Sequence, residues 1–356
     1  MSRGPRGPRR LLGGVVALLV ATASSLPGGG ARARQIPVHP SPEDSSQGLG
    51  AALAVAVRGD SLMLRPGLYR GTFTLKSGVS IVGVAGPDST VLDADGDRYV
   101  LYGREVDSTT VVTGLTIQNG RRDHPNSGGG GIYLHRSSPV IVNNVFRGHL
   151  GYLGPGVYTN YFCRPIVAFN VFRGNEGYLG GAIAAYQDCG PLVFNNFIHD
   201  NRSVSGGGIL CMNSAPVIVS NTIVGNHANQ GGIYCDSSPA LIEANVIAHN
   251  SKGGAIYSLD QDEPATIRGN LVWENAGGSV GGARSPFVGL DGNCEADPRF
   301  ADLEGRRLAR ASTSDPSPAD CLPRAGAQAW DPLAPPAIPD SILALWRDWT
   351  RAHESP

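Results

Sequence analysis

The sequence is poor in lysine, and its positive and negative charges nearly cancel. Only 2 of its 29 basic residues are lysines, and 30 acidic residues bring the formal net charge to −1. A protein that binds a nucleic acid usually carries a clear excess of positive charge on its surface. The charge balance therefore argues against a nucleic acid as the main partner.

Long hydrophobic runs are also scarce. The N-terminal apolar run, Leu11–Ala23, has 13 residues, fewer than a helix needs to cross a bilayer. Four arginines precede it and small residues follow it, which is typical of a secretory signal peptide. We expect residues 1–34 to hold this signal peptide and the start of a linker that continues over 35–47. An uncleaved anchor is the alternative, and no integral membrane span is expected after signal removal.

Metal-binding patterns are missing as well. The chain has no C-x-x-C pair and no His/Cys cluster with zinc spacing. The acidic run Asp93–Asp97 resembles the start of a calcium loop, but Arg98 and Arg104 stand where an EF-hand needs glycine and glutamate. We therefore expect a solvated turn, no metal and no cofactor, with calcium as the weaker alternative.

Glycine, in contrast, is abundant, and it recurs within a repeat. It supplies 49 of 356 residues, about twice the usual share of roughly 7%. From Gly131 to Asn275, six copies each run from an apolar opening to a proline and then to an asparagine. These asparagines are Asn144, Asn170, Asn196, Asn221, Asn245 and Asn270, spaced 26, 26, 25, 24 and 25 residues apart. A fixed period of 20–50 residues indicates a solenoid whose copies bury their apolar faces by stacking.

The copies are built from short β-type runs. Val140–Val142 and Val217–Val219 are β-branched and lie between turn residues. Three short strands and three turns fit about 25 residues at about 3.3 Å per strand residue, which suits one turn of a parallel β-coil. The copies have too little leucine for a leucine-rich repeat, and a hexapeptide period is absent. We predict an all-β, right-handed parallel β-helix over residues 48–300.

The repeated asparagines predict a structural ladder. Asparagine tolerates the left-handed conformation that a sharp bend between strands needs. Stacked amides can also bond one another, each bond contributing about 0.5–1.5 kcal/mol. A second column lies five residues later, where His149 takes the place of asparagine in the first copy. Its other members are Asn175, Asn201, Asn226, Asn250 and Asn275.

The repeat resembles that of the right-handed β-helices in the pectate-lyase-like superfamily. Gly207–Ile209, Ala215–Ile218 and Asn221–Asn226 match the Gly-Gly, x-Pro-x-Ile and Asn-x-Ile-x-x-Asn segments of that family's usual copy. The resemblance covers about residues 48–300 and implies a secreted, polysaccharide-active protein. It carries over no catalytic residue, because the Asp-Asp pair of polygalacturonases and the Tyr-Gly-x-Asp-Pro-His motif of alginate epimerases are absent.

Both ends of the solenoid have a predicted cover. An Ala/Leu-rich segment, 47–57, is expected to form a short helix over the first coil, whose strand edges and apolar interior would otherwise be open. Residues 301–356 are expected to form an irregular tail that ends in an amphipathic helix. Ile342, Leu345, Trp346 and Trp349 lie on one face of that helix, and we expect it to fold back on the solenoid.

Six cysteines are consistent with an oxidising compartment. Cys163 and Cys189 occupy equivalent positions in neighbouring copies, which lie about 4.8 Å apart in a parallel coil and within reach of a disulfide. We predict a Cys163–Cys189 bond and a Cys294–Cys321 bond. Cys211 and Cys235 either pair in the same way or serve as small core residues.

The outward face of each copy's first strand is the candidate binding surface. Strand alternation places the opening apolar residue inside and its neighbour outside. The outward neighbours include Tyr133, Tyr158, Tyr234 and Tyr257, and the next outward column contains His135, Asn160, Tyr186, Met212 and Asp236. Such a surface suits sugar stacking and hydroxyl recognition. In the alternative, long loops cover the tyrosines, which then only pack.

Two functions follow from this surface. The first is an exported protein that binds a polysaccharide, with cleavage by a lyase or glycosidase-like reaction, or epimerisation, as a further option. Tyr158, His135, Arg164 and Asp236 have the residue types that acid–base chemistry needs. The second is a non-catalytic structural protein of the envelope or cell surface. An open groove lined by the tyrosines favours the first, and tyrosines buried under loops favour the second. Either function places the protein in the periplasm, at the cell surface or outside the cell.

Overall fold

A computed structural model of the chain describes residues 33–41, 46–125, 127–259, 264–282, 289–298, 300 and 337–353. The expected signal peptide lies outside the described residues, as do Cys321 and most of the C-terminal tail.

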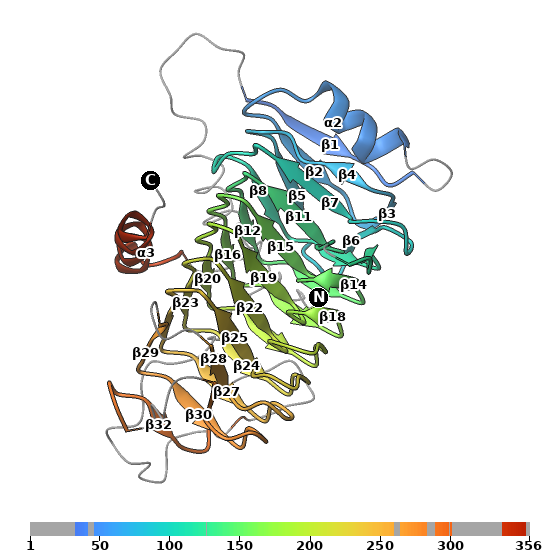
Figure 1. Cartoon of the computed structure of the whole chain (residues 1–356). Coiled ribbons are helices and arrows are strands. Elements are labelled where there is room, and N and C mark those ends of the chain that lie inside the picture. Colours follow the sequence, from blue (N-terminus) through green and yellow to red (C-terminus); the bar gives the residue numbers. More distant parts are fainter. Residues whose placement is uncertain are drawn as a thin grey trace, which may run out of the picture.

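The described strands wind into a right-handed parallel β-helix, in which each coil contributes one strand to each of three long sheets (Figure 1). The sheet that carries the first strand of each copy is called the tyrosine sheet. It contains β4 (Phe73–Thr74), β7 (Leu101–Arg104), β11 (Ile132–His135), β15 (Val157–Asn160), β19 (Ile183–Tyr186), β22 (Ile209–Met212), β25 (Ile233–Asp236), β28 (Ile256–Ser258) and β31 (Val280–Gly282).

The second strand of each coil belongs to a ten-stranded sheet, called the helix-covered sheet. It contains β1 (Gln35–Val38), β2 (Ser61–Leu64), β5 (Ser80–Gly83), β8 (Val111–Thr113), β12 (Val140–Val142), β16 (Ile166–Ala168), β20 (Leu192–Phe194), β23 (Val217–Val219), β26 (Leu241–Glu243) and β29 (Thr266–Arg268). All of its neighbours pair in parallel, so equivalent residues of successive coils lie over one another.

The third strand of each coil belongs to another ten-stranded sheet, and a short side sheet follows it in some coils. The third sheet contains β3 (Gly67–Arg70), β6 (Thr90–Asp93), β9 (Thr116–Gln118), β13 (Val145–Arg147), β17 (Val171–Arg173), β21 (Phe197–His199), β24 (Thr222–Val224), β27 (Val246–Ala248), β30 (Leu271–Trp273) and β32 (Cys294–Glu295). The side sheet contains β10 (Arg121–Arg122), β14 (Leu150–Leu153) and β18 (Glu176–Leu179).

The core is a continuous apolar column inside the three long sheets. The opening residues of the six copies all lie in it with no more than 1% of their surface exposed: Ile132, Val157, Ile183, Ile209, Ile233 and Ile256. Phe146 and Phe172 stack in the same interior with ring centroids 4.6 Å apart. Each such side chain contributes about 1.5–3 kcal/mol when fully buried, so the solenoid is stabilised along its whole length.

The predicted first asparagine column forms a hydrogen-bonded ladder. From Asn144 to Asn270 each Nδ2 donates to the Oδ1 of the next asparagine at 2.9–3.1 Å, and the ladder continues to Asn293. The residue in the left-handed conformation is not the ladder asparagine but the one before it, as at Phe169 and Asn195. The ladder amide closes the bend around that residue: Asn170 Nδ2 also donates to the carbonyl of Ala168 at 3.0 Å.

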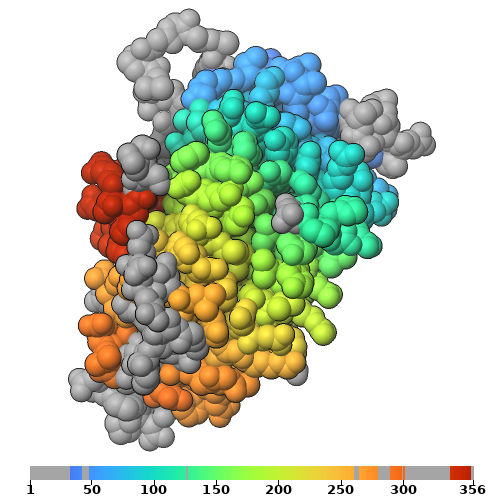
Figure 2. Space-filling model, viewed as in Figure 1, coloured from blue at the N-terminus to red at the C-terminus, as the bar shows by residue number. Residues whose placement is uncertain are grey.

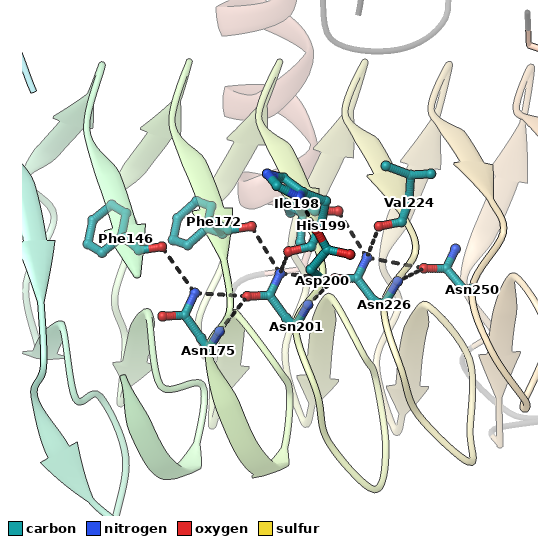
Figure 3. A network of polar contacts seen from close by, with 10 residues as sticks. All are labelled: Phe146, Phe172, Asn175, Ile198, His199, Asp200, Asn201, Val224, Asn226 and Asn250. Carbon is teal, nitrogen blue, oxygen red and sulfur yellow. Dashed lines mark hydrogen bonds and ion pairs between the residues drawn. The ribbon is translucent and has the colours of Figure 1, made fainter. Parts of the chain in front are cut away.

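The second asparagine column forms a parallel ladder, part of which is drawn in Figure 3. Asn175, Asn201, Asn226 and Asn250 each donate from Nδ2 to the next Oδ1, over 2.8–3.1 Å. His149 occupies the first position and its ring reproduces the amide: Nδ1 accepts from the Gly120 N–H at 3.0 Å, and Nε2 donates to the Ile117 carbonyl at 2.9 Å. Each buried polar group of the bend therefore has a partner, as a closed coil requires.

The N-terminal cover begins earlier than the sequence indicates. Gln35–Val38 lies in the range expected to be linker, yet it forms β1 and pairs in parallel with β2. Val38 is buried and Ile36 packs against the core, so this short strand closes the first coil. A π-helical turn, η1 (Ser46–Gly50), and α2 (Ala51–Val55) follow, and Leu49 and Leu53 bury against the same interior.

The C-terminal helix folds back on the solenoid, as its pattern predicts. Helix α3 (Asp340–Ala352) lies beside β12, β16, β20 and β23 in Figure 1 and forms the red patch in Figure 2. Trp346 and Trp349 pack on the outward apolar face of the helix-covered sheet, among residues such as Phe169 and Phe194. Their indole N–H groups donate to the carbonyls of Gly190 at 2.8 Å and Pro239 at 3.1 Å.

Candidate functional site

The outward tyrosines form two stacked groups along the tyrosine sheet, separated by Ala184 and Leu210. The ring of Tyr133 lies 5.4 Å from that of Tyr102 and 5.3 Å from that of Tyr158, measured between centroids. Further along, the rings of Tyr234 and Tyr257 stack at 5.7 Å. The strand alternation that places these side chains outside the core is therefore as expected.

Outward orientation does not make all four tyrosines accessible. Tyr158 is only 3% exposed and Tyr234 only 7%, while Tyr133 and Tyr257 are half-buried. Leu153 of the side sheet packs on Tyr158, and a side-chain carbon at Gly128 would lie 2.5 Å from the Tyr158 ring. The segment between the third strand and the next first strand thus folds over these tyrosines.

Burial also sets the chemistry of these phenols. Desolvation raises the pKa of Tyr158 far above its ordinary value, and it raises the pKa of Tyr234 to about 12. Both phenols are therefore neutral at physiological pH. Tyr158, one of the residues with a suitable type for a catalytic base, cannot take up a proton in this state.

The second outward column is in register from one strand to the next. His135, Asn160, Tyr186, Met212 and Asp236 follow one another across β11, β15, β19, β22 and β25. Each of these side chains is half-buried. Four strand spacings separate His135 from Asp236, about 19 Å at about 4.8 Å per step. These two residues therefore do not form one acid–base pair.

Two neighbouring turns next to this column are one residue longer than the turn after β11. Seven positions separate Tyr158 from Pro165 and Ala184 from Pro191, whereas six separate Tyr133 from Pro139. Each longer turn holds two consecutive residues in the left-handed conformation: Tyr161 and Phe162, with φ of 56° and 53°, and Gln187 and Asp188, with φ of 52° and 54°. The extra residue is the signal by which the sequence could have drawn attention to these turns.

The first of these long turns exposes aromatic rings beside basic groups. Tyr161 is 39% exposed and Phe162 48%. Tyr161 meets the His135 ring edge-on at 5.5 Å, and the Arg136 guanidinium lies 5.9 Å from the centre of the Phe162 ring. We call these four residues, His135, Arg136, Tyr161 and Phe162, the aromatic turn face.

The charges around the aromatic turn face act on His135. Partial burial, followed by the nearby guanidinium groups of Arg104 and Arg136, lowers the pKa of His135. The imidazole is therefore neutral at pH 7. The Glu105 carboxylate offsets part of this positive charge, since its Oε1 lies 3.9 Å from Arg104 Nε. The face together with its neighbours Arg104 and Glu105 thus offers three aromatic rings, two guanidinium cations and one carboxylate.

Two amide oxygens at the long turns have no hydrogen-bond partner among the described residues: Asn160 Oδ1 and Gln187 Oε1. Asn160 precedes Tyr161, and Gln187 opens the neighbouring turn. Buried polar atoms nearly always have a partner, so a water molecule or a hydroxyl group is the expected donor to these two oxygens.

The predicted Cys163–Cys189 disulfide is not formed, which corrects the sequence-based expectation. The two residues do lie side by side, and the Cys163 N–H donates to Cys189 Sγ at 3.3 Å. Cys163 Sγ instead lies 3.3 Å from the Asn160 carbonyl and accepts from the Ser137 N–H at 3.3 Å. Cys211 and Cys235 pair in register and are buried thiols in the core.

No metal site or membrane-spanning helix emerges from the described part of the chain. Within those residues, no three His, Cys, Asp or Glu side chains gather closely enough to hold a metal ion. Asp93 is the first residue of the segment that resembles a calcium loop. Its carboxylate accepts hydrogen bonds from the side-chain amides of Gln118 and Asn119. Within the same residues, every helix is too short or too polar to cross a bilayer.

One family model matches part of the chain, and two solved structures are similar to it at low identity. Residues 179–290 match the family described as "Right handed beta helix region". The chain is similar to the pectate lyase Pel9A, with 16% identity and a TM-score of 0.41, over 78% of this chain and 84% of that one. It is also similar to the A-module of mannuronan C-5 epimerase AlgE6 from Azotobacter vinelandii, with 15% identity and a TM-score of 0.34, over 70% and 93%. No curated protein matches it in sequence. The three long parallel sheets give the described part of the chain the fold of a right-handed parallel β-helix, which is also the fold named by the family that residues 179–290 match.

Proposed function

We propose that this protein binds a polysaccharide through the aromatic turn face. The observation that carries the proposal is the exposure of Tyr161 and Phe162 in the left-handed conformation. Bulky residues adopt this conformation at a cost of about 1–2 kcal/mol each, and here two of them in succession present their rings to solvent. Exposed aromatic rings on a rigid scaffold are suited to stacking against sugar rings.

An acidic polysaccharide suits this face better than a neutral one. The guanidinium groups of Arg104 and Arg136 both act on His135, and the Glu105 carboxylate opposes them. Arginine binds carboxylates in a planar, two-point geometry that lysine cannot reproduce. Carboxylates on a polysaccharide would therefore meet Arg136 while its sugar rings contact Phe162.

The proposal is binding, without an assigned cleavage or epimerisation step. Acid–base catalysis needs its groups within hydrogen-bonding reach of one substrate. His135 and Asp236 are four strands apart, Tyr158 is buried, and Arg164 Nη1 donates to the Asp188 carbonyl at 2.8 Å. These four residues therefore do not supply a common catalytic centre.

A second candidate function is that of a non-catalytic structural protein of the envelope or cell surface. The near-complete burial of Tyr158 and Tyr234 favours it, because covered rings only pack. Both candidates place the protein outside the cytoplasm, where the N-terminal signal pattern would direct it. The second candidate predicts no glycan ligand at all.

The decisive experiment is a glycan array probed with the full chain, its Phe162→Asn variant and a control. Asparagine tolerates the left-handed conformation at position 162, so the turn should keep its shape. We expect the wild type to select polysaccharides that carry carboxylates and the Phe162→Asn variant to lose at least tenfold in affinity. Tyr178→Asn, which removes an equally exposed ring from β18, should change nothing. Lack of any glycan signal would support the structural candidate instead.

A further inference from the structure

A cavity of about 250 Å³ lies where the end of α3 meets the turns after β15, β19, β22 and β25. It shares no residue with the aromatic turn face. Polar side chains from four turns and the end of the helix line it, among them Arg164, Asp188, Asn213, Ser237, Thr350 and His353. The cavity therefore exists only because the C-terminal helix is docked.

One wall of this cavity contains a buried hydroxyl without a partner. Thr350 is 8% exposed, and its Oγ1 has no hydrogen-bond partner among the described residues. Buried hydroxyls nearly always find a donor or an acceptor. An unpaired hydroxyl that lines a cavity points to a polar ligand or water as the missing partner.

The walls of the cavity are held in place. Trp346 and Trp349 donate to the carbonyls of Gly190 and Pro239, and both of these residues line the cavity. His353 Nδ1 lies 2.9 Å from the Trp349 carbonyl, and the two rings are 4.4 Å apart. The helix end and the turns therefore form one built site rather than a chance gap.

We infer that this cavity binds one neutral sugar ring, a site separate from the polysaccharide face proposed above. Sugar hydroxyls both donate and accept, and the walls offer groups that do the same: the Asn213 amide and the hydroxyls of Ser237 and Thr350. Arg164 Nη1 donates to the Asp188 carbonyl, which holds these two walls together. Arg164 and Asp188 bring one charge of each sign to the walls, so the cavity does not select an anionic ligand. A metal cation would meet Arg164, and no cluster of metal ligands occurs among the described residues.

The test is a fluorescence titration of the full chain with free neutral monosaccharides and with neutral oligosaccharides. Trp349 contacts His353, so a sugar in the cavity should change tryptophan emission in a saturable way. Saturation by a monosaccharide identifies a free sugar as the ligand. Saturation by oligosaccharides alone identifies a unit within a glycan. Absence of saturation with either overturns the inference.

Two variants locate the binding event. Thr350→Val should weaken sugar affinity about tenfold and leave the melting temperature unchanged or higher, because it removes an unpaired hydroxyl. Asp348→Asn, on the exposed side of the same helix, should leave the affinity unchanged. Unchanged affinity in Thr350→Val, or a lower melting temperature, would overturn the inference.

The Phe162→Asn variant separates this site from the polysaccharide face. We expect it to lose polysaccharide binding and to keep the fluorescence response to the small sugar. Loss of the small-sugar response in Phe162→Asn would show that one site serves both ligands, which would overturn the inference and leave the proposed function in place. A small-sugar response without any polysaccharide binding would overturn the proposed function alone.

Discussion

Replacing His149 by asparagine should remove an acid-sensitive element of the solenoid. His149 is 1% exposed, and desolvation lowers its pKa from 6.5 to about 4. The unfolded chain therefore binds a proton on this residue at pH values where the folded chain does not. Stability is unaffected above pH 6.5 and is lost as the pH falls from 6.5 towards 4. The loss amounts to about 2 kcal/mol at pH 5 and about 3 kcal/mol at pH 4.

Asparagine should fit the same position because the ladder already accepts it elsewhere. Asn201 Nδ2 donates to the Phe172 carbonyl at 3.0 Å, which corresponds to the bond from His149 Nε2 to the Ile117 carbonyl. The asparagine Oδ1 would accept from Gly120 in place of Nδ1. The smaller side chain leaves a gap beside Phe146, whose ring centroid is 6.3 Å from that of His149, so we expect a cost of about 1 kcal/mol at pH 7.5.

The assay is denaturant unfolding of the wild type and His149→Asn at pH 7.5 and pH 5. The wild type should lose about 2 kcal/mol more than the variant between these two values. Comparison within the pair removes the effects of other groups, such as His199, whose pKa burial also lowers. His39→Asn, at an exposed position, should behave like the wild type. Equal pH dependence in wild type and His149→Asn would refute the reasoning.

Three further predictions concern the ladder, the helix and the turn. Asn196→Ala should cost about 3 kcal/mol in denaturant unfolding, because it removes the acceptor of the buried Asn170 backbone N–H and the side-chain donor to the Val167 carbonyl. Asn229→Ala, at an exposed position, should cost under about 0.5 kcal/mol. Trp346→Ala should lower stability by about 2 kcal/mol and speed proteolysis within 337–353, and unchanged proteolysis would contradict the docking of α3. Phe162→Asn should leave the unfolding free energy within about 0.5 kcal/mol of wild type, since relief of backbone strain offsets the lost contact with Arg136. A decrease in the unfolding free energy of more than about 1 kcal/mol would mean that Phe162 has a structural role.

The sequence predicts the solenoid well because every coil solves the same problem. Each copy must bury one opening residue such as Ile132 and close one bend, so the same residue types recur at a fixed spacing. The amide ladder follows from this repetition. The asparagines recur for a different reason from the one that the pattern suggests. The left-handed conformation belongs to the residue before each asparagine, and that residue need not be an asparagine, as Phe169 shows.

The candidate site was harder to predict, because it depends on what the inter-strand segments do. The sequence does not show which way the segments between copies fold. Two of them, Leu150–Leu153 and Glu176–Leu179, fold back over Tyr158 and its neighbours. Gly128 was a usable clue, since only glycine leaves room for the Tyr158 ring there. The cysteines illustrate a similar limit: spacing puts Cys163 beside Cys189 but does not decide whether their sulfurs bond.

The most direct measurement of the proposed function is hydrogen exchange on the full chain, with and without the polysaccharide that the array selects. Binding at the aromatic turn face should slow exchange in peptides that cover 133–137 and 160–164. Peptides from β28 and α3 should exchange as in the free protein. Protection confined to other coils, or no protection at a saturating concentration, would contradict the assignment of the face.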